Sequence, residues 1–171
     1  VDAAAGADMP LVRRVKVGPL REGPAMAFGG AQPTLLDALN VLNSSAIATN
    51  SPDVLPDTLA DTLADAVAGD VPASESGIAA LAAQHGLSAR DLAQLAVDDA
   101  LQQVAAAAQA LTEGVNARPI YTLAALKALR EARPTHAWLV GGPACCVARR
   151  LSQALDMPVQ TPPHADVANA V

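Results

Sequence analysis

Apolar residues recur at helical spacing between residues 89 and 113, and polar residues occupy the opposite side. This repeat predicts one long amphipathic helix over Ala89–Glu113, with Gly114 placed to end it. Ser88 stands at the N-cap position, and Gly86 followed by Leu87 is typical of the end of a preceding helix. The apolar face consists of Ala93, Val97, Ala100, Leu101, Val104, Ala108 and Leu111.

Shorter amphipathic stretches predict further helices on both sides of this one. A helix over Thr34–Leu42 has a threonine at its N-cap position and three leucines on its buried stripe. The small polar residues Asn43–Asn50 predict a loop after it. A second helix is predicted over Asp57–Gly69, and Ser74 is placed to cap a third. Leucine spacing predicts a fourth over Thr122–Ala132.

The stretch THAWLVGGPACCVARRLSQAL predicts a strand, a glycine turn and a helix in direct succession. Ala137–Val140 is a short apolar run of the kind that forms a strand buried on both faces. Two glycines end the strand, and a proline then occupies the first helical position. The helix follows over Ala144–Leu155, and Met157–Gln160 predicts a second strand. Strand, helix and strand at this spacing favour a parallel βαβ unit.

The overall pattern predicts a helix-rich α/β fold in a single domain. Two more short strands are expected upstream, at Leu11–Val17 and at Ala25–Phe28. We expect residues 1–50 and 115–171 to form the α/β part, with residues 51–114 as a helical excursion from it. The chain has no initiator methionine, and ADVANAV stops inside a predicted helix, so we expect a fragment of a larger protein.

The composition narrows the classes of partner. The formal net charge is −6 and only two lysines, Lys16 and Lys127, are present, so a nucleic acid or an anionic membrane is not expected as a partner. No apolar run reaches the roughly 18–20 residues that cross a bilayer. The two cysteines, Cys145 and Cys146, are adjacent and form no disulfide framework, which favours a cytoplasmic location.

The first candidate binding site is the turn formed by Gly141, Gly142 and Pro143. The carboxyl end of a strand, glycine backbone and a helix N-terminus meet there, and open α/β sheets place their ligands at such points. Glycine also lets a planar or phosphate-bearing ligand approach the backbone. An ordinary tight turn between strand and helix has the same sequence features, so both interpretations stay open.

The second candidate is the segment with Gly29 and Gly30, followed by Thr34 and Asp37. In one interpretation this loop faces a phosphate or a metal and Asp37 is directed at that ligand, which makes it a candidate catalytic residue. In the other, Thr34 and Asp37 cap their own helix and need no ligand. The sequence weighs these interpretations equally.

No metal site is predicted. His85 and His136 have no ligand spacing, so zinc is not expected. His164, Asp166 and Asn169 cluster near the end of the chain, where capping of the last helix is the simpler explanation.

Three segments, taken in order, resemble the hydantoinase A/oxoprolinase family. The segment GPLREGPAMAFGGAQPTLLDALNVLN is similar to the part of that family where VGP leads to FGG and then to a T-x-T-D-A helix. WLVGGPA resembles the family's strand and Gly-Gly turn, and MPVQTPPHADVANAV resembles its closing segment. The resemblance spans nearly the whole chain.

The resemblance implies an RNase H-like second lobe of the actin/sugar-kinase/Hsp70 ATPase superfamily, with a short mixed sheet and a helical subdomain. It implies ATP-dependent hydrolysis of five-membered cyclic amides, with ATP and Mg²⁺ as cofactors and a missing N-terminal lobe as partner. Gly141 and Gly142 would pack against adenosine, and Gly29, Gly30 and Asp37 would lie near the phosphates or the substrate. An open groove at Gly141 and Gly142 is therefore expected. The isolated fragment is expected to be inactive, and an oligomer is possible.

Two alternatives remain. Leu36 replaces the middle threonine of T-x-T-D, and this departure leaves room for an ATP-driven chaperone or reactivase of the same fold. The alanine-rich helix over Ala89–Glu113 could instead belong to a helical interaction module that binds no nucleotide.

Overall fold

The computed structural model describes residues 23–49, 69–117, 132–141, 144–163 and 165. Four α-helices dominate this part of the chain, together with a short 3₁₀-helix and a two-stranded parallel sheet. In order, these elements are η1 (Met26–Phe28), α1 (Leu35–Thr49), α3 (Val71–Gln84), α4 (Ala89–Asn116), β1 (Ala137–Trp138), α6 (Ala144–Leu155) and β2 (Val159–Gln160). The described part is therefore helix-rich with a small parallel sheet, which is compatible with an α/β fold.

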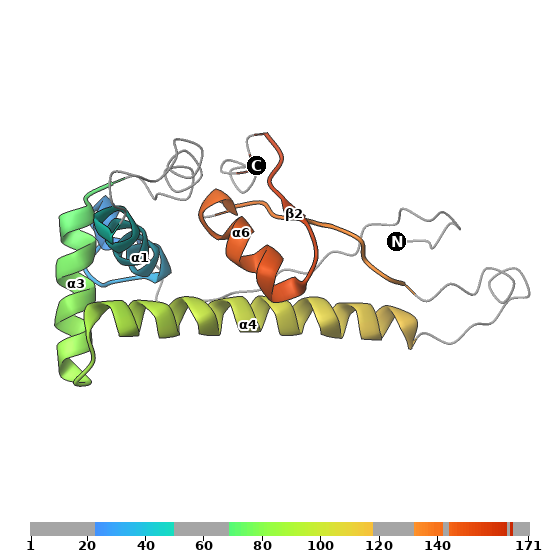
Figure 1. Cartoon of the computed structure of the whole chain (residues 1–171), viewed down its shortest axis with the longest axis horizontal. Helices are drawn as coiled ribbons and strands as arrows, with labels where there is room; N and C mark the ends of the chain where they lie inside the picture. Colours follow the sequence, from blue (N-terminus) through green and yellow to red (C-terminus); the bar gives the residue numbers. More distant parts are fainter. Residues whose placement is uncertain (1–22, 50–68, 118–131, 142–143, 164, 166–171) are drawn as a thin grey trace, which may run out of the picture.

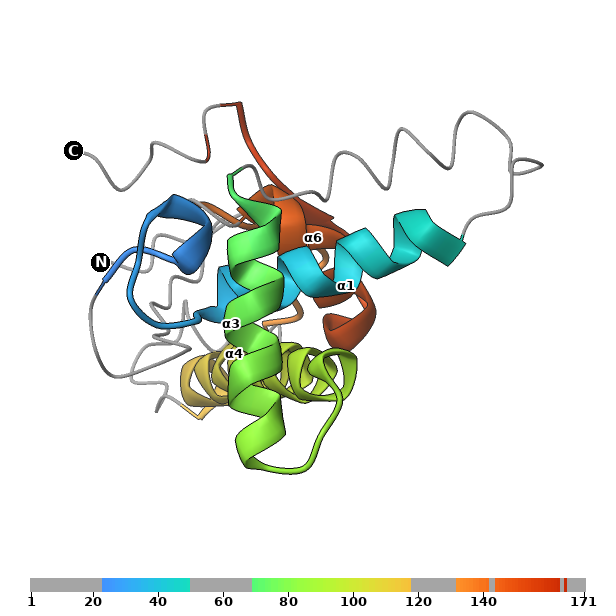
Figure 2. The same ribbon diagram turned by 90° about the vertical axis from the view of Figure 1, so that its left-hand side faces the viewer.

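The long helix α4 is the base on which the other elements are arranged. Its 28 residues span about 42 Å at the usual rise per residue. Figure 1 shows α3 crossing α4 near its N-terminal end, α1 lying in the corner between them, and α6 with the sheet further along α4. Figure 2, turned by 90°, shows α3 in front of both α1 and α4. α1 contacts α3 and α4, while α6 contacts α4 and β2.

The hydrophobic core lies where α1 meets α3, α4 and α6. Leu39 at its centre has no solvent exposure, and small residues such as Ala38 and Ala93 let the helix backbones approach closely. Alanine and leucine therefore do the packing that aromatic residues do in other cores. The buried cluster consists of Ala38, Leu39, Val41, Leu42, Ile78, Ala93, Val97 and Cys146.

The corner between α3 and α4 confirms the caps predicted there. The Leu87 amide donates to the Ala82 carbonyl and the Gly86 amide to the Ala83 carbonyl, which is the hydrogen-bond pattern of a Schellman motif. Gly86 has a φ of +67°, a backbone conformation that glycine adopts without strain. Ser88 then caps α4, because its hydroxyl accepts from the Asp91 amide at 3.1 Å.

The parallel βαβ unit is also confirmed. Ala137 of β1 pairs with Val159 of β2 and Trp138 pairs with Gln160, both in parallel register. α6 connects the two strands. The predicted burial of β1 on both faces is wrong, because Trp138 is 57 % exposed and Val140 is 52 % exposed. Within the described residues α6 covers one face of the sheet and leaves the face of Trp138 open.

Several predicted boundaries need correction. Ala25–Phe28 is not a strand, since Met26–Phe28 forms a 3₁₀-helix. The segment predicted as a loop from Asn43 is helical through Thr49, as part of α1. α3 starts at Val71 with Asp70 as its N-cap, so Ser74 lies inside the helix. α4 continues through Gly114 to Asn116.

The side chain of Asn116 holds the end of α4 to the chain that leads into β1. Its Nδ2 donates to the Ala132 carbonyl at 3.2 Å, and its Oδ1 accepts from the Ala132 amide at 2.7 Å. One side-chain amide thus pairs with both polar groups of one residue, 16 positions later in the sequence. The predicted strand Leu11–Val17, the helix of residues 57–68 and nearly all of Thr122–Ala132 lie outside the described residues.

Candidate functional site

Asp37 is the centre of a buried polar cluster in the described structure. It lies in the first turn of α1 and has no solvent exposure. Its carboxylate accepts five hydrogen bonds, from the amides of Met26, Ala27 and Thr34 and from the hydroxyls of Thr34 and Ser74. A buried carboxylate with this many donors is well compensated for the loss of water.

The hydrogen bonds to Asp37 join three segments of the chain. Oδ2 accepts from the Met26 amide at 3.0 Å and from the Thr34 amide at 2.7 Å. Oδ1 accepts from the Ala27 amide at 2.9 Å and from the Ser74 hydroxyl at 2.7 Å. The bond to the Thr34 amide is the reach back to the N-cap that defines half of a capping box. Asp37 therefore fixes η1 and α3 to the start of α1.

The environment of Asp37 keeps its side chain ionised. Burial by itself raises the pKa of this carboxyl group, but the hydrogen bonds from Ser74, Ala27, Thr34 and Met26 favour the charged form and outweigh it. The net result is a pKa below the ordinary value of 3.8. Of the two interpretations of Asp37, helix capping matches this geometry, because the carboxylate is enclosed and presents no surface to a ligand.

Ser74 and Asn40 extend the hydrogen-bond network of Asp37. The sequence did not indicate this role for either residue. Asn40 on α1 donates from Nδ2 to Ser74 Oγ at 3.0 Å, and the Ser74 hydroxyl in turn donates to Asp37. Both residues are buried. One sequence signal was present: Ser74, Ile78 and Ala82 share one face of α3 at four-residue spacing, so a hydroxyl stands on an apolar stripe.

Gly29 and Gly30 form a tight turn directly after η1. Gly29 has a φ of +81° and its amide donates to the Met26 carbonyl, while the Gly30 amide donates to the Ala25 carbonyl. A side chain at Gly30 would overlap the carbonyl group of Pro24, so only glycine fits there. Because both amides are already used within the turn, this segment does not offer them to a phosphate.

Phe28 is the large side chain that this turn presents to solvent. It is 53 % exposed, although the backbone beneath it is held by Asp37 through the amide of Ala27. Its ring lies beside Gly69, and the Asp70 amide donates to the Ala27 carbonyl. The turn and the N-terminus of α3 therefore form one connected surface.

Gly141 lies at the carboxyl end of β1, as predicted, but the expected open groove is not found at this residue. Gly141 is buried and has a φ of +128°. Its amide donates to the Ala165 carbonyl at 2.7 Å, and its carbonyl accepts from the Ala144 amide at 3.0 Å. Both of its backbone groups are thus occupied. Gly142 and Pro143 lie outside the described residues.

The two candidate turns occupy different parts of the fold. The turn at Gly29 and Gly30 is held against α1 and α3, and Gly141 is held between α6 and the segment after β2. No group of three or more His, Cys, Asp or Glu side chains that could hold a metal ion occurs among the described residues. His85 is exposed at the end of α3, and His136 lies edge-on to Trp138 with ring centroids 6.2 Å apart.

No protein-family model matches the chain, and no curated protein or solved structure matches it either. In the part of the chain that the structure describes, none of the helices combines the length and the apolar character needed to cross a membrane.

Proposed function

We propose that this chain is part of an ATP-dependent hydrolase of five-membered cyclic amides, similar to hydantoinases and oxoprolinases. In this proposal it forms an RNase H-like second lobe and contributes the adenosine side of a site shared with another lobe. The observation that carries the proposal is the parallel β1–α6–β2 unit with a glycine at the carboxyl end of β1. It occurs at the predicted place in the ordered set of three family-like segments.

The hydrogen bonds of the Gly141 backbone indicate which part of ATP this turn would contact. Since the amide and carbonyl of Gly141 are both hydrogen-bonded, Gly141 is not suited to holding a phosphate group. Backbone that carries no side chain and whose polar groups are already paired, as at Gly141, suits the flat face of a purine, which packs through dispersion and burial. Under the proposal, Gly141 holds this backbone in place, and Gly142 and Pro143, which lie outside the described residues, keep their predicted role on the adenosine side.

The chemistry requires the other lobe as well. An amide is a poor electrophile, and a phosphoryl group transferred to its oxygen would let water attack the carbonyl carbon. The ring C–N bond would then break, and the resulting acyl phosphate would be hydrolysed to the acid and phosphate. Such a transfer depends on Mg²⁺ and on in-line positioning of the reacting groups. Under the proposal the residues that bind the phosphates lie outside this chain. Asp37 has a structural role, because it holds the turn at Gly29 and Gly30 in place.

The test uses the longer protein of which we expect this chain to be part. It is assayed for ADP release with ATP, Mg²⁺ and a panel of hydantoins and 5-oxoproline, with each substrate omitted in turn. Substrate-dependent ADP release supports the proposal, and release no higher than without substrate overturns it. Calorimetry of the present chain with MgATP should give weak binding or none, because half of the site is missing.

A helical interaction module without nucleotide is a second candidate, and the burial of Gly141 favours it. In that case the longer protein binds no ATP, even at millimolar concentration, and α4 carries the interface with a partner. The same calorimetric titration, made on the longer protein, separates the two candidates.

A further inference from the structure

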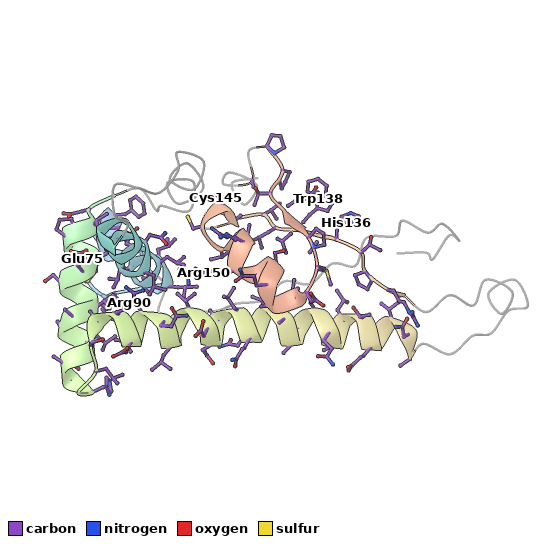
Figure 3. The ribbon with its side chains drawn as sticks, viewed as in Figure 1. Glu75, Arg90, His136, Trp138, Cys145 and Arg150 are labelled. Carbon is purple, nitrogen blue, oxygen red and sulfur yellow. The ribbon has the colours of Figure 1, made fainter. Side chains whose placement is uncertain are left out.

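Two thiols lie side by side at the start of α6. Cys145 and Cys146 are the second and third residues of this helix, and their Sγ atoms are 3.6 Å apart. Cys145 is exposed, whereas Cys146 is buried in the core cluster. Figure 3 labels Cys145 at the start of α6, with its sulfur directed away from the helix. One sulfur is therefore open to solvent, and the other lies directly behind it.

The distance between the sulfurs suits two bonds to one central atom. Thiolates bonded to a metal at about 2.3 Å and at a tetrahedral angle are about 3.8 Å apart. A pyramidal centre has narrower bond angles and brings its two sulfurs closer than this, so the observed 3.6 Å suits such a centre with at most a small side-chain rotation. A disulfide, by contrast, needs the sulfurs at about 2.05 Å, which would distort the first turn of α6.

The surroundings limit what the pair can hold. Zinc at a structural site needs four protein ligands. Among the described residues no third His, Cys, Asp or Glu joins the two thiols in a metal-binding group. The pair therefore fits a centre that is complete with two sulfur ligands, such as a trivalent arsenic atom that already carries one organic substituent.

We propose that Cys145 and Cys146 form a dithiol site for thiophilic trivalent metalloids of this class. When an organic arsine oxide binds, each thiol loses its proton and two S–As bonds form. The As–O bond breaks and the oxygen leaves with both protons as water, so no electrons are transferred. The site is a property of the start of α6 and does not depend on the proposed hydrolase function.

The test uses phenylarsine oxide with the whole chain and native mass spectrometry as the readout. The chain contains only two cysteines, so every dithiol adduct within one molecule must use both. We expect one arsenical per monomer, removed by 2,3-dimercaptopropanol but not by the same concentration of thiol groups supplied as 2-mercaptoethanol. That difference is the signature of a chelate.

Cys145→Ser is the decisive variant, because the side chain is exposed and its replacement leaves the core unchanged. We expect binding to weaken at least about 100-fold, since the chelate is lost. Cys146→Ser should do the same, and circular dichroism reports whether this buried variant remains folded. The proposal is overturned if Cys145→Ser binds as tightly as the wild type, if the wild type takes up no arsenical, or if the adduct joins two chains.

Discussion

The hydroxyl of Ser74 donates a 2.7 Å hydrogen bond to Oδ1 of Asp37, which lies 37 positions earlier in the sequence. This bond connects the first turns of two helices, and the same carboxylate reaches the amides of Met26 and Ala27. One ionised side chain therefore holds η1, α1 and α3 together. Its replacement should affect the whole turn that contains Gly29 and Gly30.

Asp37→Asn should destabilise the chain by about 3 kcal/mol, the typical cost of leaving buried hydrogen-bonding groups badly paired. The amide keeps the shape of the side chain, but its NH₂ group replaces one carboxylate oxygen. This group can only donate, and it faces the donors that contact that oxygen in the wild type. Urea unfolding monitored by circular dichroism measures the change. Asp98→Asn, at an exposed site on α4 whose Oδ1 accepts from Gln94, is the matched control and should change stability by less than about 0.5 kcal/mol. Equal effects of the two substitutions would contradict the structural role of Asp37.

The stability contributed by Asp37 should depend on pH. Its folded-state pKa lies below the ordinary 3.8, so the unfolded chain binds a proton more readily in the window between these two values. The contribution is fully present above 3.8 and is lost as pH falls through the folded pKa. Urea midpoints of wild type and Asp37→Asn, measured between about pH 6 and pH 2, should therefore converge toward acid. Parallel curves would show that the pKa is not lowered.

Ser74→Ala should cost about 1–3 kcal/mol, because it removes one donor to Asp37 and leaves the Asn40 amide without its acceptor. Ser76→Ala on the exposed side of the same helix is the control, and it should be close to neutral. Unfolding midpoints of the two variants, measured under one condition, provide the comparison. A neutral Ser74→Ala would mean that the bond between α3 and α1 contributes nothing measurable.

Gly30→Ala should destabilise the turn by at least about 2 kcal/mol, since the added methyl group has no space beside the Pro24 carbonyl. Gly114→Ala makes the same chemical change inside α4, where nothing lies within 4 Å of the new atom. That variant should gain about 0.5–1 kcal/mol from improved helix propensity. Thermal unfolding should thus shift in opposite directions for the two variants.

Trp138 should behave as a solvent-exposed fluorophore. It is the chain's one tryptophan and is 57 % exposed, so its emission should lie at long wavelength and acrylamide should quench it readily. Trp138→Ser should change the free energy of unfolding by less than about 0.5 kcal/mol. Blue-shifted emission that resists quenching would show instead that this face of the sheet is covered.

Local signals in the sequence predicted the elements whose stability is local. The cap at Ser88, the Schellman end at Gly86 and the parallel pairing across α6 follow from short motifs, and the structure confirms them. The extension of α1 over Asn43–Thr49 was missed, because small polar residues favour loops in isolation. Contacts with other parts of the fold override that preference at the start of the extension, where Asn43 is buried and the Ser44 hydroxyl donates to Glu75 of α3 at 2.7 Å.

The polar cluster was only half predictable, for a related reason. The spacing of Thr34 and Asp37 indicated a cap, but no local rule links Asp37 to Ser74 on another helix. Ser74 looked like an N-cap because serine favours that position, whereas Asp70 takes it and leaves the Ser74 hydroxyl for a long-range bond. The prediction of an open groove at Gly141 was wrong for a similar reason. The Gly141 amide donates to the carbonyl of Ala165, which lies 24 residues later in the sequence.

The pairing of Asn116 with Ala132 makes the chemistry of one amide group decisive at the end of α4. Its Nδ2 donates and its Oδ1 accepts, so both backbone groups of Ala132 are satisfied by one side chain. Aspartate at this position offers no donor and leucine offers neither group, so neither residue can replace asparagine at this contact although both are similar in size.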